Sequence, residues 1–257
     1  MDKLKSWMAC PPTKGLDLDD PSTTQLRRQI IRRKSFLRQI YREWYRVLVE
    51  ALPVGQGLTL ELGSGAGFLD EMLPGVITTE LFYCPGIRAV LDAQRLPWAN
   101  ESLRAIVMVN VLHHIPRPHD FFAEATRCVR AEGAIIMIEP WVTRWSRWVY
   151  AHLHHEPFHP DAREWEFRST GPLSGANGAL AWMIFGRDKG KFESMFPAWQ
   201  IERVELMLPF AYLLSGGVSL RRLMPGWTFG FWRRIERRLD PWSEALAMFA
   251  HIVLRKK

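Results

Sequence analysis

A glycine-rich segment at residues 61–67 (Glu-Leu-Gly-Ser-Gly-Ala-Gly) directly follows a short apolar run at 58–62. Glycines at alternate positions let the backbone turn sharply and let a ligand approach the main chain closely. A strand that leads into such a loop, with a helix behind it, is the context of a nucleotide-binding motif. Phe68 stands where the dinucleotide fingerprint requires glycine, and no Gly-Lys-Ser/Thr run is present. Neither a dinucleotide site nor a phosphate loop is therefore indicated.

Apolar runs alternate with helical patterns along most of the chain. The expected strands are 58–62, 76–79, 88–91, 104–110, 134–138, 199–206 and 245–254, and the expected helices are 68–73, 119–130 and 188–196. Continuous apolar strands separated by helices indicate a parallel sheet that is covered on both faces. The pattern therefore predicts a doubly wound α/β fold.

Residues 1–54 are expected to form a loose leader (1–21) and one long amphipathic helix from about residue 22 to residue 52. Arginines fill much of the polar side of this helix: Arg27, Arg28, Arg32, Arg33, Arg38, Arg42 and Arg46. Such a helix is either docked with a solvated basic face, or it offers a surface for phospholipid headgroups or an acidic carrier protein. A main domain is expected over 55–257, with cap insertions at about 140–190 and 207–243.

The chain carries a formal net charge of +7 and has a pI near 9.6. This balance favours an acidic partner: a nucleic acid, an anionic membrane surface, an acidic carrier protein or an anionic substrate. Three widely spaced cysteines indicate neither a disulfide framework nor a zinc knuckle. No signal peptide and no apolar run of about 20 residues is evident. We expect a cytoplasmic protein, with a peripheral position at the inner face of a membrane as an option.

Further motifs follow the glycine loop in a fixed order. Glu80 ends the second predicted strand, and Asp92-Ala93 follows the third, just before Leu96-Pro97-Trp98. The fourth strand ends in Asn110-Val111-Leu112-His113-His114, and a turn at 127–133 follows. With the loop, these elements over residues 55–140 resemble the class I S-adenosylmethionine-dependent methyltransferases, and most closely their small-molecule branch of ubiquinone-type and sugar methyltransferases. Ala131 and Glu132 depart from the Pro-Gly that is usual in the last turn.

The resemblance implies a Rossmann-like sheet of seven strands, mostly parallel with an antiparallel last strand, and helical cap insertions. It also implies S-adenosylmethionine as cofactor and S-adenosylhomocysteine as product. The loop would surround the amino-acid part and sugar of the cofactor, Glu80 would bind the ribose hydroxyls, and Asp92 would accept from the adenine amino group. The cofactor-binding residues that it implies are Glu61, Gly63, Ser64, Gly65, Gly67, Glu80, Asp92, Ala93, Asn110 and Val111. Because twelve residues separate Glu80 from Asp92, the usual intervening helix must be short or missing.

Histidine is the expected base for a hydroxyl acceptor, because it titrates near neutral pH. His113, His154 and His155 are the candidate bases, although His113 and His114 also fit a packing role. Trp141, Tyr150, His154 and Glu156 are the candidate acceptor contacts. No metal site is expected, since the adjacent histidines His154 and His155 would point about 100° apart on one helix.

The predicted function is therefore methyl transfer to a small aromatic, polyketide-like or lipid- or carrier-linked acceptor, at oxygen or carbon. The many tryptophans of the two insertions favour an apolar acceptor, but they could equally fill the core of the cap. Two alternatives stay open. One is an RNA or other nucleic-acid methyltransferase, although the Asn/Asp-Pro-Pro-aromatic run of base methyltransferases is missing. The other is a non-catalytic cofactor-binding protein.

Overall fold

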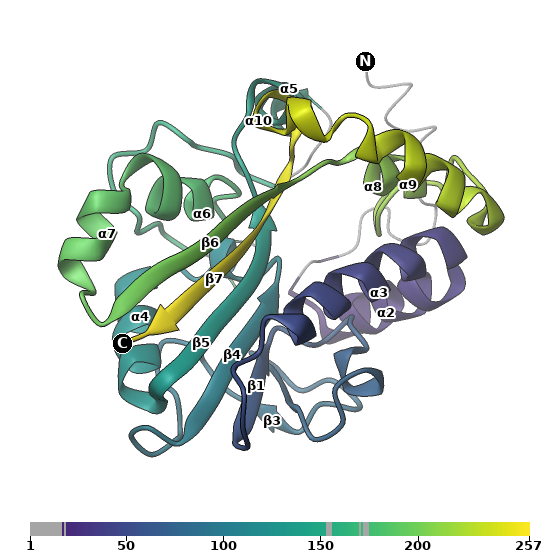
Figure 1. Cartoon of the computed structure of the whole chain (residues 1–257). Helices are drawn as coiled ribbons and strands as arrows, with labels where there is room; N and C mark the ends of the chain where they lie inside the picture. Colours follow the sequence, from purple (N-terminus) through teal and green to yellow (C-terminus); the bar gives the residue numbers. More distant parts are fainter. Residues whose placement is uncertain (1–16, 18, 153–155, 170, 172–174) are drawn as a thin grey trace.

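The structure is a computed structural model that describes residues 17, 19–152, 156–169, 171 and 175–257. A seven-stranded sheet runs through its centre (Figure 1). The strands are β1 (Leu58–Leu62), β2 (Ile77–Glu80), β3 (Ala89–Val90), β4 (Leu103–Val109), β5 (Val129–Pro140), β6 (Trp199–Met207) and β7 (Phe249–Lys256). Their order is β3-β2-β1-β4-β5-β7-β6. The five strands from β3 to β5 pair in parallel, and β7 is antiparallel to both β5 and β6. The predicted Rossmann-like sheet with an antiparallel last strand is thus confirmed.

The central strands are buried on both faces because their side chains alternate between two apolar clusters. In β4, Ile106 and Met108 point into one cluster and Val107 points into the other. The first cluster is completed by the helices α4 (Pro118–Cys128), α6 (Leu180–Trp182) and α7 (Lys189–Met195) and by a π-helical turn, η4 (Met183–Arg187). These elements come from the main domain and the first insertion.

The opposite face of the sheet is covered by the N-terminal segment. It forms two helices, α2 (Pro21–Arg33) and α3 (Ser35–Glu50), which lie side by side in Figure 1. The buried side of α3 carries Phe36, Leu37, Ile40, Trp44, Tyr45 and Leu48. Trp44 contacts Phe249 of β7, with a ring-centroid distance of 5.2 Å. The predicted basic helix is therefore a structural layer of the domain, and its polar side faces outward.

The single long helix predicted for residues 22–52 is wrong in one respect. The chain takes an extended conformation at Lys34 (φ −81°, ψ 90°), which separates α2 from α3. The ammonium group of Lys34 donates to the carbonyl oxygens of Gly217 and Leu220 in the second insertion. Neither glycine nor proline lies at this break, so the sequence contains no local signal for it. The contacts of Lys34 with the second insertion are tertiary.

Three other local predictions need correction. The helix expected at 68–73 is a single 3₁₀ turn, η2 (Leu69–Glu71), and the helix expected at 119–130 ends at Cys128. The last strand begins at Phe249, because residues 243–246 form the short helix α10. Residues 81–88 between β2 and β3 contain no helix, as the short spacing between Glu80 and Asp92 predicts.

The first insertion begins with α5 (Arg144–His152), and the second contains α8 (Phe210–Ser215), α9 (Phe229–Arg237) and α10 (Ser243–Leu246) with the turns η5 (Gly226–Thr228) and η6 (Asp240–Trp242). In Figure 1, α5 and α10 lie at the top of the molecule, and α8 and α9 lie at the upper right. Within the described residues, no helix combines the length and apolar character needed to cross a bilayer.

We predict that Lys34→Met loosens the second insertion, because two backbone carbonyls lose their buried charged donor. The expected cost is about 1–3 kcal/mol of unfolding free energy. Urea denaturation measures this loss, and limited proteolysis should show faster cleavage near residues 216–224. Lys189→Met, which removes an exposed lysine of α7, is the matched control. Equal stability of the two variants would contradict the prediction.

Candidate functional site

The glycine loop is tied to the neighbouring strand β2. The backbone N–H of Ser64 donates to the carbonyl of Thr79 (2.8 Å), and its hydroxyl accepts from the Thr79 N–H (3.1 Å) and donates to the carbonyl of Glu61 (3.2 Å). The Ser64 side chain is therefore used within the protein. It holds the loop in place and lines neither of the cavities described below.

Each glycine of the loop stands against a neighbour that leaves no room for a side chain. A Cβ at Gly63, whose φ is +64°, would lie 2.4 Å from Val111. A Cβ at Gly65 would lie 2.6 Å from the Glu80 carboxylate and 2.5 Å from Thr24 of α2, and one at Gly67 would lie 2.3 Å from the Tyr45 hydroxyl. The loop thus needs glycine for close packing against β2, α2 and α3, and α2 covers part of it.

Glu80, at the end of β2, is buried beside this loop. Its two carboxylate oxygens accept the backbone N–H groups of Gly65 (2.9 Å) and Leu81 (3.2 Å). Because an ionised carboxylate has about four acceptor positions, two remain for hydroxyl groups of a ligand. Glu80 lines both cavities of the site.

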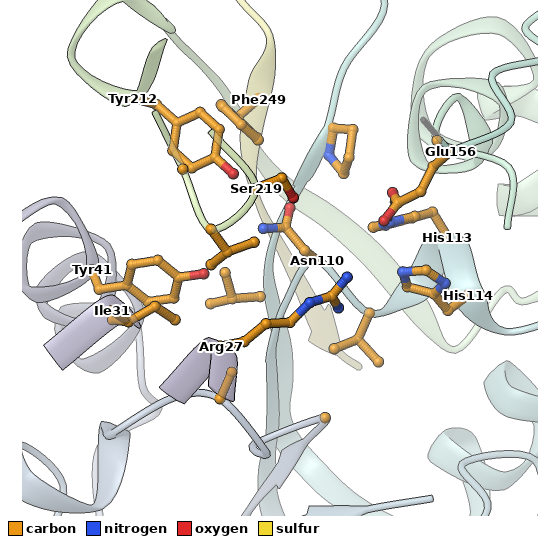
Figure 2. A pocket seen from close by; sticks show the side chains of 18 of the residues that line it. Arg27, Ile31, Tyr41, Asn110, His113, His114, Glu156, Tyr212, Ser219 and Phe249 are labelled. Atoms are coloured by element: carbon orange, nitrogen blue, oxygen red, sulfur yellow. Dashed lines mark ion pairs between the residues drawn. The ribbon is translucent and has the colours of Figure 1, made fainter. Parts of the chain in front are cut away.

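Glu61, at the end of β1, has a buried oxygen atom, Oε2, with no partner among the described residues. Burial raises the pKa of its carboxyl group to about 7. An unpaired buried carboxylate is costly unless a cation or donor approaches it, so this atom is suited to bind an ammonium group. Arg27 of α2, which points into the same cavity (Figure 2), offers a cation for a carboxylate.

Two adjoining cavities occupy the ends of the strands. The larger has a volume of about 430 Å³ and the smaller about 410 Å³. Gly63, Glu80, Val111 and His114 line both, so the cavities share one wall. Of the predicted cofactor residues, Asp92 and Ala93 line the smaller cavity, and Glu61, Gly67 and Asn110 line the larger one.

Asn110 lies directly after β4 and lines the larger cavity. It has a positive φ of +56°, its backbone N–H donates to Ile138, and its buried Oδ1 has no partner among the described residues. A non-glycine residue in this region of φ is uncommon and often marks a functional site.

The turn η3 (Leu112–His114), which follows β4, is held by Glu139 at the end of β5. One oxygen of the Glu139 carboxylate accepts the backbone N–H groups of Val111 and Leu112, each at 2.7 Å. The other lies 2.7 Å from Nδ1 of His113. Three contacts to one fully buried carboxylate therefore fix the position of this turn and of both histidines.

His113 lies between two carboxylates. Its Nε2 is 3.5 Å from Glu156, and its Nδ1 faces Glu139. Burial opposes the charged ring, but the two carboxylates outweigh it and raise the pKa of His113 to about 10. A raised pKa favours the protonated ring and so does not favour a base role for His113, which stays a prediction.

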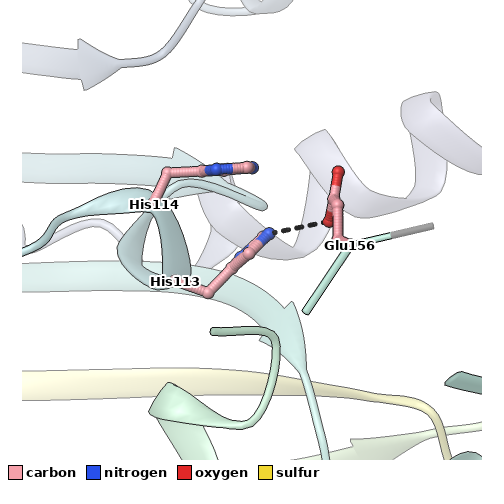
Figure 3. Close-up of side chains that lie close together, drawn as sticks. All are labelled: His113, His114 and Glu156. Atoms are coloured by element: carbon pink, nitrogen blue, oxygen red, sulfur yellow. Dashed lines mark ion pairs between the residues drawn. The ribbon is translucent and has the colours of Figure 1, made fainter. Parts of the chain in front are cut away.

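His114 has the opposite character. Burial, and then the positive charge of His113, lower the pKa of His114 to about 4. Its Nδ1 lies 3.2 Å from the carbonyl of Gly175, so Nδ1–H is the donor and Nε2 carries a lone pair. His113, His114 and Glu156 each have one ligand atom within 4.8 Å of the others (Figure 3).

The angular argument against a metal site concerned His154 and His155, which lie outside the described residues. His113 and His114, on a 3₁₀ turn, form a different group with Glu156. The prediction of no metal stays a prediction.

The predicted acceptor contacts divide into three groups. Tyr150 and Glu156 line the larger cavity. Trp141 does not: it is buried in the apolar cluster on the other face of the sheet, close to Gly186. His154 and His155 lie outside the described residues.

Several residues of the larger cavity were not predicted. Tyr41 of α3 and Tyr212 of α8 point their hydroxyl groups into it (Figure 2), and Thr24, Arg27 and residues 216–220 contribute to its wall. These residues are far apart in the sequence and carry no motif. Glu139 could have been recognised, because a charged residue directly after the apolar run 134–138 has to find a partner at the end of a buried strand.

Comparison with known proteins agrees with this geometry. Residues 60–137 match a family model described as "Methyltransferase domain", and no curated protein matches the chain. A solved geranyl diphosphate methyltransferase in complex with SAM is 14% identical, with coverage of 97% of this chain and 96% of that chain and a TM-score of 0.53. A geranyl diphosphate C-methyltransferase from Streptomyces coelicolor A3(2), in complex with Mg²⁺, geranyl-S-thiolodiphosphate and S-adenosyl-L-homocysteine, is 11% identical, with coverage of 84% and 76% and a TM-score of 0.51. At these identities the likeness shows the fold.

Residues 60–137 thus carry a methyltransferase domain, and the chain has the fold of the class I methyltransferases. S-adenosylmethionine is the cofactor that this domain and fold support, and the small-molecule branch stays a prediction. The residues present fit the cofactor: Glu61, with its unpaired oxygen, lines the larger cavity, Asp92 lines the smaller one, and Gly63 and Glu80 line both. When bound, S-adenosylmethionine supplies a methyl group activated by its sulfonium.

We predict that Gly65→Ala weakens S-adenosylhomocysteine binding by about tenfold or more, equivalent to about 1.4 kcal/mol. The added methyl would displace the Glu80 carboxylate and Thr24 from the loop. Isothermal titration calorimetry measures the affinity. Gly190→Ala, in α7, is the matched control, because an added Cβ there meets no atom within 4 Å. An unchanged affinity in Gly65→Ala would refute this assignment of the loop.

We also predict that S-adenosylhomocysteine binds more tightly as the pH rises from about 6 to 8. The ammonium group of the ligand favours ionised Glu61, whose pKa of about 7 in the free protein lies within this window. Calorimetry in buffers of different ionisation enthalpy should show proton release on binding near pH 7. Glu61→Gln should bind weakly and lose this pH dependence. If the pH dependence persists in Glu61→Gln, another group is responsible.

Proposed function

We propose that this enzyme methylates an acidic hydroxyl group, or an activated carbon, of a small and largely apolar acceptor of aromatic, polyketide-like or lipid- or carrier-linked type. The observation that supports this best is the composition of the larger cavity. Beyond the glycine loop much of its wall is aromatic and aliphatic, and the two histidines of the turn η3 and Glu156 lie among its polar groups. Its apolar and aromatic wall residues include Ile31, Tyr41, Val149, Tyr150, Phe158, Tyr212, Leu213, Val218, Met248 and Phe249.

The proton of the acceptor would pass to His114. Its Nε2 carries a lone pair, it lies on the wall that the two cavities share, and Glu156 lies within 4.8 Å. A positive charge that develops on the ring would be stabilised by this carboxylate. His113, held as an imidazolium by Glu139 and Glu156, cannot compete for the proton.

The low pKa of His114 has a consequence for the acceptor. A base with a pKa of about 4 is weak and accepts a proton efficiently only from an acidic group. Phenols, enols and the carbon atoms between two carbonyl groups meet this requirement better than an aliphatic alcohol does. The lowered pKa of His114 is thus consistent with an aromatic or polyketide-like reacting group.

His113 and Glu139 would act as positioning residues. Glu139 fixes η3 through two backbone N–H groups, and η3 carries His114 into the shared wall. Because direct methyl displacement depends on alignment of the reacting atoms, a change at Glu139 should affect both cofactor and acceptor sites.

We predict that His114→Ala lowers kcat about 10²–10⁴-fold and leaves S-adenosylhomocysteine affinity within about threefold of wild type. The assay follows S-adenosylhomocysteine formation with a panel of alkyl-substituted phenols and 1,3-dicarbonyl compounds of graded acidity. The loss should be largest for the least acidic members. His152→Ala, which changes a half-buried histidine of α5 that lines neither cavity, is the control.

Two outcomes would contradict the proposal. Either no panel member yields methylated product while the protein binds S-adenosylhomocysteine, or His114→Ala retains full kcat across the panel. Mass spectrometry of the products, which gain one methylene, distinguishes oxygen from carbon methylation through fragmentation.

A further inference from the structure

The second insertion exposes large aromatic side chains to solvent. Trp227 is 87% exposed, Phe231 63% and Trp242 64%. Leu223, in the same insertion, is also exposed. Single exposed apolar residues are normal on a protein surface, but a group of this size within one segment marks an interaction site.

Two of these aromatic residues lie on one stripe of a helix. The turn η5 continues directly into α9, and Trp227, Phe231, Arg234 and Arg238 follow one another at spacings of four, three and four residues. Residues at this spacing share one face. All four are exposed, and we call them the aromatic–basic stripe.

The other side of α9 anchors the stripe to the domain. Phe229 packs edge-on against Phe36 of α3, with a ring-centroid distance of 5.2 Å. Arg233 forms ion pairs with Glu43 of α3 and with the buried Glu236. The outward orientation of the stripe is therefore fixed by buried contacts.

The stripe is rich in positive charge. Arg222 and Arg237 are exposed beside it, while Arg234, Arg237 and Arg238 form no ion pair in the described part of the chain. Asp240 and Glu244 are the exposed acidic residues of the segment that follows. The stripe thus combines aromatic rings with a local excess of arginine.

The basic face of the N-terminal helices differs from the stripe, because several of its arginines are used within the protein. Arg28 donates to the carbonyl of Pro85, Arg32 and Arg38 bind Glu71, and Arg46 lies 3.8 Å from Glu50. That face also exposes no large aromatic side chain in the described residues.

We propose that the aromatic–basic stripe binds the surface of an anionic lipid bilayer. Tryptophan and phenylalanine insert at the level of the headgroups, and arginine is attracted to anionic phosphate. The two kinds of side chain share one exposed face of a helix that lies flat on the domain, which is the arrangement an interfacial helix needs. Single-stranded nucleic acids also stack their bases on aromatic rings, but they do so along a basic groove, and no residue of the stripe lines either of the two cavities.

The stripe belongs to the same insertion that closes the larger cavity. Tyr212, Leu213 and residues 216–220 line that cavity, and the stripe begins seven residues later in the chain. Binding at the stripe would place this cap against the lipid. The proposal does not depend on the identity of the acceptor, because vesicle binding is measured without turnover.

The experiment is flotation of the full chain with vesicles of phosphatidylcholine alone and of phosphatidylcholine mixed with phosphatidylglycerol. Wild type should float with the anionic vesicles, and added salt should weaken this binding. Arg234→Gln/Arg238→Gln should lower the partition coefficient about tenfold or more, and Trp227→Ser/Phe231→Ser should abolish binding. Arg33→Gln/Arg42→Gln, which removes the same charge from exposed positions of α2 and α3, should bind as wild type does.

Each variant should keep the Tm and the S-adenosylhomocysteine affinity of wild type, since the stripe makes no contact with the cofactor cavities. The proposal is overturned if wild type does not float with anionic vesicles. It is also overturned if the α2–α3 control loses binding as much as the stripe variants do, or if an acidic carrier protein binds the stripe and vesicles do not. A failure of methyl transfer in the panel assay would leave the flotation result intact.

Discussion

The buried carboxylate of Glu139 connects the sheet to the chemistry of this enzyme. It lies at the end of β5 and holds the turn after β4 through two backbone N–H groups and the ring of His113. Because these hydrogen bonds are charge-assisted and shielded from water, each is stronger than a hydrogen bond between neutral groups at the surface. The position of His114, the charge of His113 and the wall between the two cavities all follow from this contact.

The remaining walls come from segments that are remote in the sequence. The helices α2 and α3 pack against one face of the sheet and bring Arg27 and Tyr41 to the site, and α8, which packs against α3, adds Tyr212. The cofactor loop is thus enclosed by parts of the chain outside the alternating α/β core. The same segments therefore influence both the affinity for the cofactor and the shape of the acceptor cavity. The N-terminal helices contribute to both.

Much of the α/β core could be predicted, because glycine spacing and apolar runs are local signals. The strand β1 and the ends of β2 and β4 lie where the pattern places them, with Glu80, Asp92 and Asn110 at cavity walls. The cap could not be predicted in the same way. Trp141 and Tyr150 both follow β5, yet one packs in the core and the other lines the cavity, and only the course of the chain decides between them. The charge states of His113 and His114 also depend on tertiary burial, since the two residues are adjacent in sequence.

The place of β7 in the sheet has a consequence for how the chain acquires its structure. It is the last of the seven strands along the sequence, yet it lies between β5 and β6 and forms ladders with both. Trp44 of α3 packs on Phe249 at its start. Contacts of such long sequence separation form slowly. During synthesis, β5 and β6 have unpaired edges, and part of the apolar side of α3 is uncovered, until β7 is available. We therefore expect the nascent chain to be prone to aggregation until residues 249–256 have left the ribosome.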